Sequence, residues 1–164
     1  MELLYFGPID ISSLEEDYDV KIQLNGKTIR LDLNFEQTQM SKQQLAIIER
    51  FLENISSFNE QNATFIENDF NDEEGQVKEY LSFHIEELGD DFLGQLKIDK
   101  DASDKEQQLL GKLELVRVGL YPDGKYGTEY FAVFDYTLNR DLSDELIVVK
   151  TDNEGHLDHI AWES

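Results

Sequence analysis

The chain has 164 residues, 36 of them acidic and 14 basic, which gives a formal net charge of −22; it contains no cysteine. This length suits one domain, and a hydrophobic fraction of 40% supplies the apolar area that a disordered acidic chain lacks. The lack of cysteine excludes disulfides, a thiolate nucleophile, iron–sulfur clusters and cysteine-bound zinc. A strongly anionic surface repels nucleic acid and anionic membranes and attracts basic proteins or divalent cations. The charge therefore favours a basic protein partner, with no direct binding to nucleic acid or membrane.

The compartment is predicted from the same features. Residues 1–11 include Glu2 and Asp10 and have no basic region before an apolar stretch, unlike a signal peptide. No apolar run approaches the roughly 20 residues that a membrane helix needs. Together with the missing cysteine, this pattern predicts a cytoplasmic protein.

The first predicted element is a β-hairpin over residues 18–35. Apolar and polar residues alternate on both sides of Asn25-Gly26, a pair that readily adopts the positive φ angles of a type I′ turn. Before the hairpin, Leu3 to Phe6 is expected to add a short edge strand.

A helical segment of three to four helices is predicted over residues 41–110. Ser41 and Gln44 have capping-box spacing, and the helix that follows places apolar residues on one stripe. A second helix is expected over residues 59–70. Gly75 opens a third, which Gly89 is expected to end, and a short fourth helix follows over residues 103–110. The apolar stripe of the first helix comprises Leu45, Ile48, Phe51, Leu52 and Ile55, and that of the third Val77, Leu81, His84 or Ile85, and Leu88.

Residues 113–162 are predicted to form a four-stranded antiparallel meander, with a strong turn at residues 121–124. Its strands carry apolar residues on both faces, with Phe131 and Val133 beside Phe134 and Tyr136. One face is therefore expected to lie against the helices and the other to be partly covered. The whole chain is predicted to be a single α+β domain, and the pattern leaves open whether the hairpin and the meander share one sheet.

The carboxylates closest to a calcium-binding pattern fail its spacing rules. Asp99, Asp101 and Ser103 have the odd-position spacing of an EF-hand loop. Asp104, however, stands where the turn glycine is needed, and Leu110 stands where the bidentate glutamate is needed. Solvated loop acids are the favoured interpretation.

The three histidines do not form a predicted site either. On a strand, His156 and Asp158 share one face while His159 points to the other, so they cannot converge on zinc without a bulge. His84 is expected to be a half-buried, hydrogen-bonded histidine of the third helix rather than a catalytic base. No serine-hydrolase elbow, P-loop, dinucleotide fingerprint or zinc-protease motif is present. We predict no catalytic residue, no metal and no cofactor.

Several short motifs in the C-terminal third match a known pattern. They are Val118-Gly119-Leu120-Tyr121-Pro122-Asp123-Gly124, Phe134-Asp135-Tyr136-Thr137-Leu138, Leu146-Ile147-Val148-Val149-Lys150, Gly155 and Glu163-Ser164. With these, the chain resembles a family of small uncharacterised bacterial α+β domains. These motifs are a turn, strand cores and a chain end, and the resemblance implies no catalytic residues. In general character such small acidic proteins are similar to immunity proteins, which neutralise a cognate bacterial toxin by binding it.

These observations favour a non-enzymatic bacterial binding protein, of the immunity type, whose acidic face docks a basic protein partner. The alternatives are a hydrolase with a carboxylate pair or a carboxylate-bound metal, and a DNA-mimicking inhibitor with carboxylates in two rows. The helical middle is where charge could concentrate on one face. The residues predicted to bind the partner are Glu67, Asp69, Asp72, Glu73, Glu74, Glu86, Glu87, Asp90 and Asp91.

Overall fold

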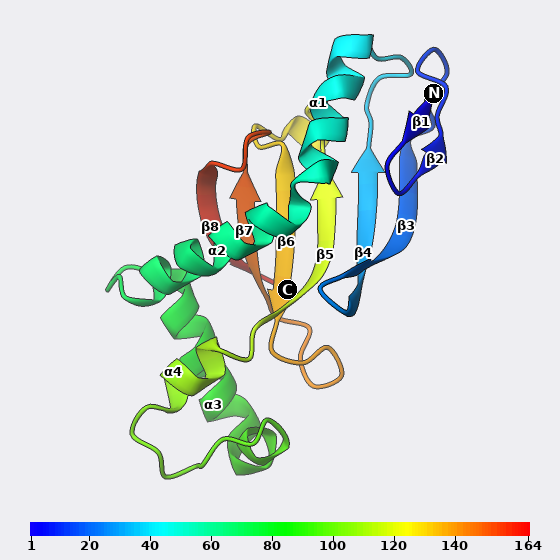
Figure 1. Cartoon of the computed structure of the whole chain (residues 1–164). Helices are drawn as coiled ribbons and strands as arrows, with labels where there is room; N and C mark the ends of the chain where they lie inside the picture. Colours follow the sequence, from blue (N-terminus) through cyan, green and yellow to red (C-terminus); the bar gives the residue numbers. More distant parts are fainter.

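A six-stranded sheet with strand order β3-β4-β5-β6-β7-β8 organises the protein, as a computed structural model of all 164 residues shows (Figure 1). Neighbouring strands pair antiparallel except β4 and β5, which are parallel. The hairpin and the meander thus form one sheet. The strands are β3 (Asp17–Leu24), β4 (Lys27–Asn34), β5 (Glu114–Leu120), β6 (Ala132–Thr137), β7 (Leu146–Thr151) and β8 (Leu157–Glu163).

The predicted hairpin and meander are both confirmed. Asn25 and Gly26 connect β3 to β4 with φ angles of 52° and 81°, as a type I′ turn requires. Strands β5 to β8 are consecutive neighbours, which is the arrangement of a meander. A register shift between Leu115 and Arg117 leaves Val116 unpaired in a bulge of β5.

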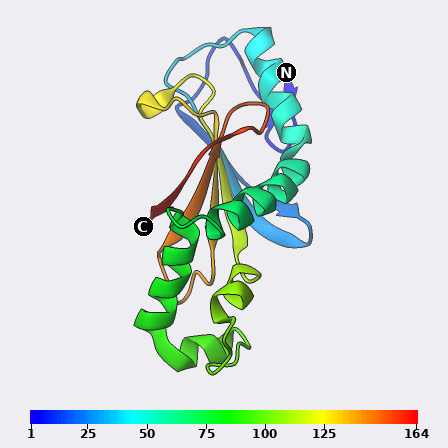
Figure 2. The same cartoon turned by 90° about the vertical axis from the view of Figure 1, so that its left-hand side faces the viewer.

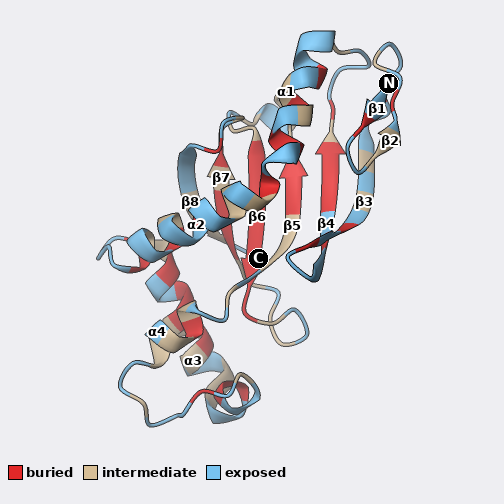
Figure 3. Ribbon diagram, in the orientation of Figure 1, coloured by how far each residue is buried: buried red, intermediate tan, exposed pale blue.

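Helices α1 (Lys42–Glu53) and α2 (Ile55–Phe70) cover one face of the sheet, while the other face carries no α-helix (Figure 2). The predicted capping box is present, since Gln44 N donates to Ser41 Oγ and Ser41 N donates to Gln44 Oε1. The five apolar stripe residues from Leu45 to Ile55 are all buried. Figure 3 shows the result: the central strands are buried and the helices expose their outer sides.

The remaining helices project beyond the end of the sheet (Figures 1 and 2). They are α3 (Gln76–Gln95), with Gly75 as its N-cap, and α4 (Lys105–Leu110). At Gly89 the backbone has φ 68° and ψ −159°, so the helix breaks there and then resumes. A single cluster of 31 buried apolar residues nevertheless extends from the sheet into these helices.

Four local predictions differ from the structure. Residues 2–3 (β1) pair with residues 7–8 (β2) in a separate two-stranded ribbon, so the segment from Leu3 to Phe6 is no edge of the main sheet. The second helix begins at Ile55 rather than Asn59, because only Asn54 interrupts the helical path after α1.

Gly89 bends α3 without ending it, since helical residues follow to Gln95. Phe131 precedes β6 and packs on Phe51 of α1 at a ring distance of 5.1 Å, so it lies on the helix side.

Candidate partner-binding surface

Negative charge is concentrated where the chain leaves the sheet. Residues 67–106, here called the acidic arm, contain 14 acidic and 4 basic residues and carry a net charge of −10. The other 124 residues, here called the sheet body, contain 22 acidic and 10 basic residues, for a net −12. The arm therefore carries about one net charge per four residues, against about one per ten in the body. This concentration on a projecting element makes the arm the candidate surface for a basic partner.

The nine predicted partner-binding residues all lie in the arm, in two separate groups. One group surrounds the α2–α3 turn and comprises Glu67, Asp69, Asp72, Glu73 and Glu74; the other lies on α3 around Gly89 and comprises Glu86, Glu87, Asp90 and Asp91. With a helical rise of about 1.5 Å per residue, the ten positions from Gln76, the first residue of α3, to Glu86 correspond to about 15 Å along the helix. The structure thus divides the predicted set into two acidic patches rather than one cluster.

One member of the set, Asp69, holds the start of α3 in place. Asp69 is half-buried, and its Oδ2 accepts a hydrogen bond of 2.7 Å from Val77 N at the start of α3. The carbonyl of the same residue lies so close to Gly75 that a Cβ there would stand 2.0 Å from it. Asp69 therefore fixes the turn between α2 and α3, and only glycine fits opposite it.

The other eight carboxylates are exposed. Asp72 accepts a hydrogen bond from Glu74 N at 3.0 Å, and Asp90 lies 4.0 Å from Lys100 Nζ. An exposed ion pair of that length contributes little to stability. These side chains are therefore free to meet positive charges of another molecule.

The arm is held to the body by an aromatic joint at the start of α3. Tyr80 and Phe83 pack against Trp162 of β8, with ring distances of 5.9 and 5.2 Å. Tyr80 OH donates to the carbonyl of Glu145 at 2.8 Å, and burial raises the pKa of Tyr80 to about 12. Trp162 Nε1 donates to the carboxylate of Glu145 at 2.6 Å. The loop before β7 thus receives hydrogen bonds from both α3 and β8.

His84 completes this joint and is buried more deeply than the sequence predicted, with 0% exposure. Its Nδ1 lies 2.7 Å from the carbonyl of Tyr80, and its Nε2 lies 2.7 Å from Ser143 Oγ. The neutral tautomer with the proton on Nδ1 satisfies both contacts, because the Ser143 hydroxyl can donate to Nε2. Burial lowers the pKa of His84, so the neutral form is favoured.

Residues considered for metal binding do not converge. His156 Nδ1 lies 3.0 Å from Asp152, and His159 Nδ1 lies 2.5 Å from its neighbour Asp158. In the segment that resembles a calcium loop, Asp99 accepts a hydrogen bond from Asp101 N at 2.9 Å. Nowhere in the chain do three histidine, aspartate or glutamate side chains gather as metal ligands would.

The helix-free face of the sheet contains a buried ionic network that sequence reasoning missed. Arg117 donates to both carboxylate oxygens of Asp32 at 2.8 and 2.9 Å, to Asp135 at 3.2 Å and to Tyr121 OH at 3.0 Å. Burial alone would lower the pKa of Arg117, but its bonds to Asp32 raise it, whereas burial raises the pKa of Asp135. The side chain lies against Gly119, where a Cβ would stand 2.4 Å from the guanidinium.

Charges elsewhere on this face are also paired. Arg30 contacts Asp19 at 2.7 Å, and Lys150 contacts Glu163 at 2.9 Å. Lys150 also lies over the ring of Tyr130, 4.9 Å from its centroid. Cross-strand ion pairs therefore balance the helix-free face, which offers a basic partner less net charge than the arm.

Comparisons with family models, with curated proteins and with solved structures find no match to this chain. None of the helices is long and apolar enough to cross a membrane.

Proposed function

We propose that this is a non-enzymatic bacterial binding protein of the immunity type, which works in the cytoplasm and neutralises a basic protein partner by docking it on the acidic arm. The observation that supports this function is the net −10 of residues 67–106 on exposed helices that project from the sheet. A field of one sign accelerates association with a partner of the opposite sign, and it disfavours nucleic acid and anionic membranes.

The average surface charge would not suffice for this function. The protein exposes 9169 Å², so −22 corresponds to about one net charge per 420 Å². A partner footprint of about 800 Å² would then meet only about two net charges. The arm raises this number because it carries nearly half of the net charge on about a quarter of the chain. Focusing of charge in the arm is what makes electrostatic docking effective.

The alternatives lack a comparable supporting arrangement. A carboxylate- or metal-dependent hydrolase needs acids from separate segments gathered in a pocket, whereas the nine predicted acids lie on an exposed surface in two patches. A DNA mimic needs two rows of charge at roughly one per 100 Å² of surface. The two patches lie near opposite ends of the first part of α3, which fits two docking points better than two rows.

A pull-down with charge-matched variants tests the proposal. The arm variant carries Glu86→Gln, Glu87→Gln, Asp90→Asn and Asp91→Asn. The body variant carries Glu15→Gln, Glu16→Gln, Asp17→Asn and Glu36→Gln, four exposed acids of the sheet body. Each variant loses four negative charges relative to the natural chain, so the two variants have the same net charge and differ only in where the charges are removed.

The tagged natural chain is expected to retain one basic protein from a bacterial lysate at low salt and to release it at a defined salt step. The arm variant should release it at a clearly lower salt concentration, and the body variant should behave like the natural chain. Equal losses in both variants would show that net charge, not the arm, attracts the partner. Retention that does not depend on salt would contradict the electrostatic mechanism.

A further inference from the structure

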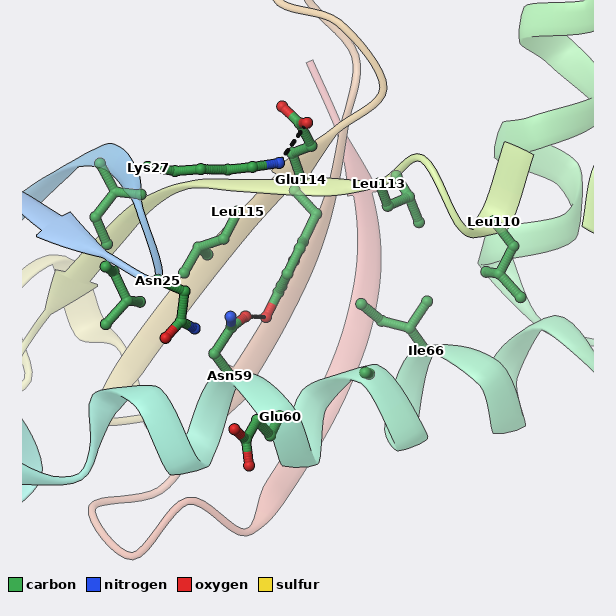
Figure 4. Close-up of a pocket in the computed structure, with 13 residues that line it drawn as sticks. Asn25, Lys27, Asn59, Glu60, Ile66, Leu110, Leu113, Glu114 and Leu115 are labelled. Atoms are coloured by element: carbon green, nitrogen blue, oxygen red, sulfur yellow. Dashed lines mark hydrogen bonds and ion pairs between the residues drawn. The ribbon is translucent and has the colours of Figure 1, made fainter. Parts of the chain in front are cut away.

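An apolar groove opens where the arm meets the sheet body (Figure 4). It has a volume of about 390 Å³, within the size range of ligand pockets in proteins. Four segments line it: α2, the turn end of the β3–β4 hairpin, the stretch from Leu110 of α4 to Leu115 of β5, and Tyr136 of β6. Its apolar walls are supplied by Leu24, Ile29, Ala63, Ile66, Leu110, Leu113 and Leu115.

The polar groups of the groove are few and placed at its floor and rim. On the floor, Tyr136 OH donates to Asn59 Oδ1 at 2.6 Å and accepts a hydrogen bond from Asn62 Nδ2 at 3.2 Å. At the rim, Lys27 Nζ lies 2.5 Å from Glu114, so the cation that lines the groove is already neutralised (Figure 4). Glu60 also lines the groove; it is exposed and forms no ion pair.

The charges around the groove determine which apolar group can enter it. Lys27 and Glu114 cancel, so the lining carries one net negative charge from Glu60. On α2, Glu67 of the acidic arm follows the lining residue Ala63 by four positions, so the two lie on the same side of the helix. An apolar group next to a negative charge would be repelled here, whereas one next to a positive charge would be attracted at both positions.

We propose that this groove receives an apolar side chain of leucine or phenylalanine size that is flanked by lysine or arginine in the basic partner. The inference rests on the proposed function and adds a buried apolar anchor, which charge alone does not supply. Long-range charge accelerates encounter, whereas a buried anchor slows dissociation. Because Glu67 borders both surfaces, one partner can use the arm and the groove together.

Three blocked tripeptides test the groove without the unidentified partner. They are acetyl-Lys-Phe-Lys-amide, acetyl-Lys-Ala-Lys-amide and acetyl-Glu-Phe-Glu-amide, each titrated into the ¹⁵N-labelled full chain while amide shifts are recorded. The Lys-Phe-Lys peptide should move the amides of Asn59, Ala63 and Leu115 and bind at least about tenfold more tightly than Lys-Ala-Lys, as burial of an aromatic ring implies. The Glu-Phe-Glu peptide should bind more weakly than Lys-Phe-Lys.

A filled groove supplies the second arm of the test. Ala63→Leu adds a side chain at an exposed position of α2 that lines the groove, and Thr64→Leu adds the same side chain at the next exposed position, which does not line it. Ala63→Leu should reduce Lys-Phe-Lys binding to the level of Lys-Ala-Lys, and Thr64→Leu should leave it unchanged. Equal behaviour of the two variants, or equal binding of Lys-Phe-Lys and Lys-Ala-Lys, would overturn the proposal.

This experiment separates the groove from the arm. The arm variant described above should bind Lys-Phe-Lys at the groove like the natural chain, because its four substitutions lie outside the lining. If the pull-down fails but Ala63→Leu still blocks the peptide, the proposed function is wrong and the groove remains a site for apolar groups carried by cations. If the peptide does not reach the groove, this inference is wrong whatever the arm binds.

Discussion

The sheet body and the acidic arm use their charged residues in different ways. In the body, Arg30, Arg117 and Lys150 pair with acids on neighbouring strands, with the Arg117 network largely buried. In the arm, the single ion pair joins Lys100 Nζ to Asp90 Oδ2 at 4.0 Å, and both side chains are exposed. A buried ion pair is costly to break because removal of one partner leaves an uncompensated buried charge, whereas exposed like charges repel one another and remain available for binding. In this protein, Arg30, Arg117 and Lys150 of the body are paired within the sheet, whereas most of the arm's acids are exposed and form no ion pair, as the proposed docking function requires.

Removing the centre of the body's network should have the largest effect. In Arg117→Leu, the carboxylates of Asp32 and Asp135 stay buried without their cation. Loss of one partner from a buried ion pair costs about 3–5 kcal/mol. We expect the free energy of unfolding, measured by urea denaturation, to fall by that amount.

The exposed pair on the same face provides the control for this substitution. Arg30 meets Asp19 with 52% of its side chain exposed, against 21% for Arg117. Arg30→Leu should lower the free energy of unfolding by less than about 1 kcal/mol. Similar losses of unfolding free energy for Arg117→Leu and Arg30→Leu would show that the buried network is no more important for stability than the exposed ion pair.

The break in α3 should respond to substitution by a smaller amount, and the effect should stay in the arm. Gly89 has φ 68° and ψ −159°, a region that only glycine occupies readily. Gly89→Ala should therefore lower the free energy of unfolding by about 1–3 kcal/mol. Hydrogen exchange should accelerate at amides beyond Gly89 and stay unchanged in strands β4 to β7.

Gly94 is the matched control within the same helix. It has helical geometry, and a Cβ added there would meet nothing within 4 Å. Gly94→Ala should raise the free energy of unfolding by up to about 1 kcal/mol, because alanine favours the helix more than glycine does. A loss of stability at Gly94 would mean that the chain beyond the break is not helical in solution.

Neutralising the arm should change stability still less, and in the opposite direction. The arm variant with Glu86→Gln, Glu87→Gln, Asp90→Asn and Asp91→Asn removes like charges from exposed positions that form only one long ion pair. Its free energy of unfolding should stay the same or rise by less than about 1 kcal/mol. A loss larger than this would show that the arm's acids stabilise the fold, and the contrast with the body would fail.

Local sequence signals predicted most of the fold. The Asn25-Gly26 turn, the Ser41–Gln44 capping box and the alternating strands each depend on neighbours in sequence, and each is present. The parallel pairing of β4 with β5 was left open because about 80 residues separate the two strands. Neither strand alone specifies that register, which pairs Leu31 with Val118 and Leu33 with Leu120 and buries all four side chains in the core.

The candidate surface was predicted in composition but not in arrangement. The sequence located the nine acids, yet only the length of α3 separates them into two patches. Arg117, Asp32 and Asp135 occupy polar positions in alternating strands, where solvent exposure is the ordinary expectation. The cross-strand register brings them together, so the useful signal was opposite charge at the centres of three strands. The groove is lined by four segments that are separate in sequence, so no local sequence signal predicts it.

The smallest expected effect appears only below neutral pH, at the joint between arm and body. His84 contacts Tyr80 and Ser143, with the charge of Glu145 nearby. Burial lowers the pKa of His84 in the folded state, so below the unfolded value of about 6.5 the unfolded chain binds more protons than the folded one. Its contribution to stability is complete above about pH 6.5 and decreases as the pH falls through the folded pKa.

Two measurements check this sign. An NMR titration of the His84 imidazole should give a midpoint below about 6.5. Urea denaturation at about pH 7.5 and about pH 5.5 should show a smaller pH-dependent loss in His84→Gln than in the exposed-site control His156→Gln, because only the first removes the buried group. A His84 midpoint above the ordinary value would mean that Glu145 and the acidic arm outweigh burial at the joint. The arm would then be held more tightly, not less, as the pH falls.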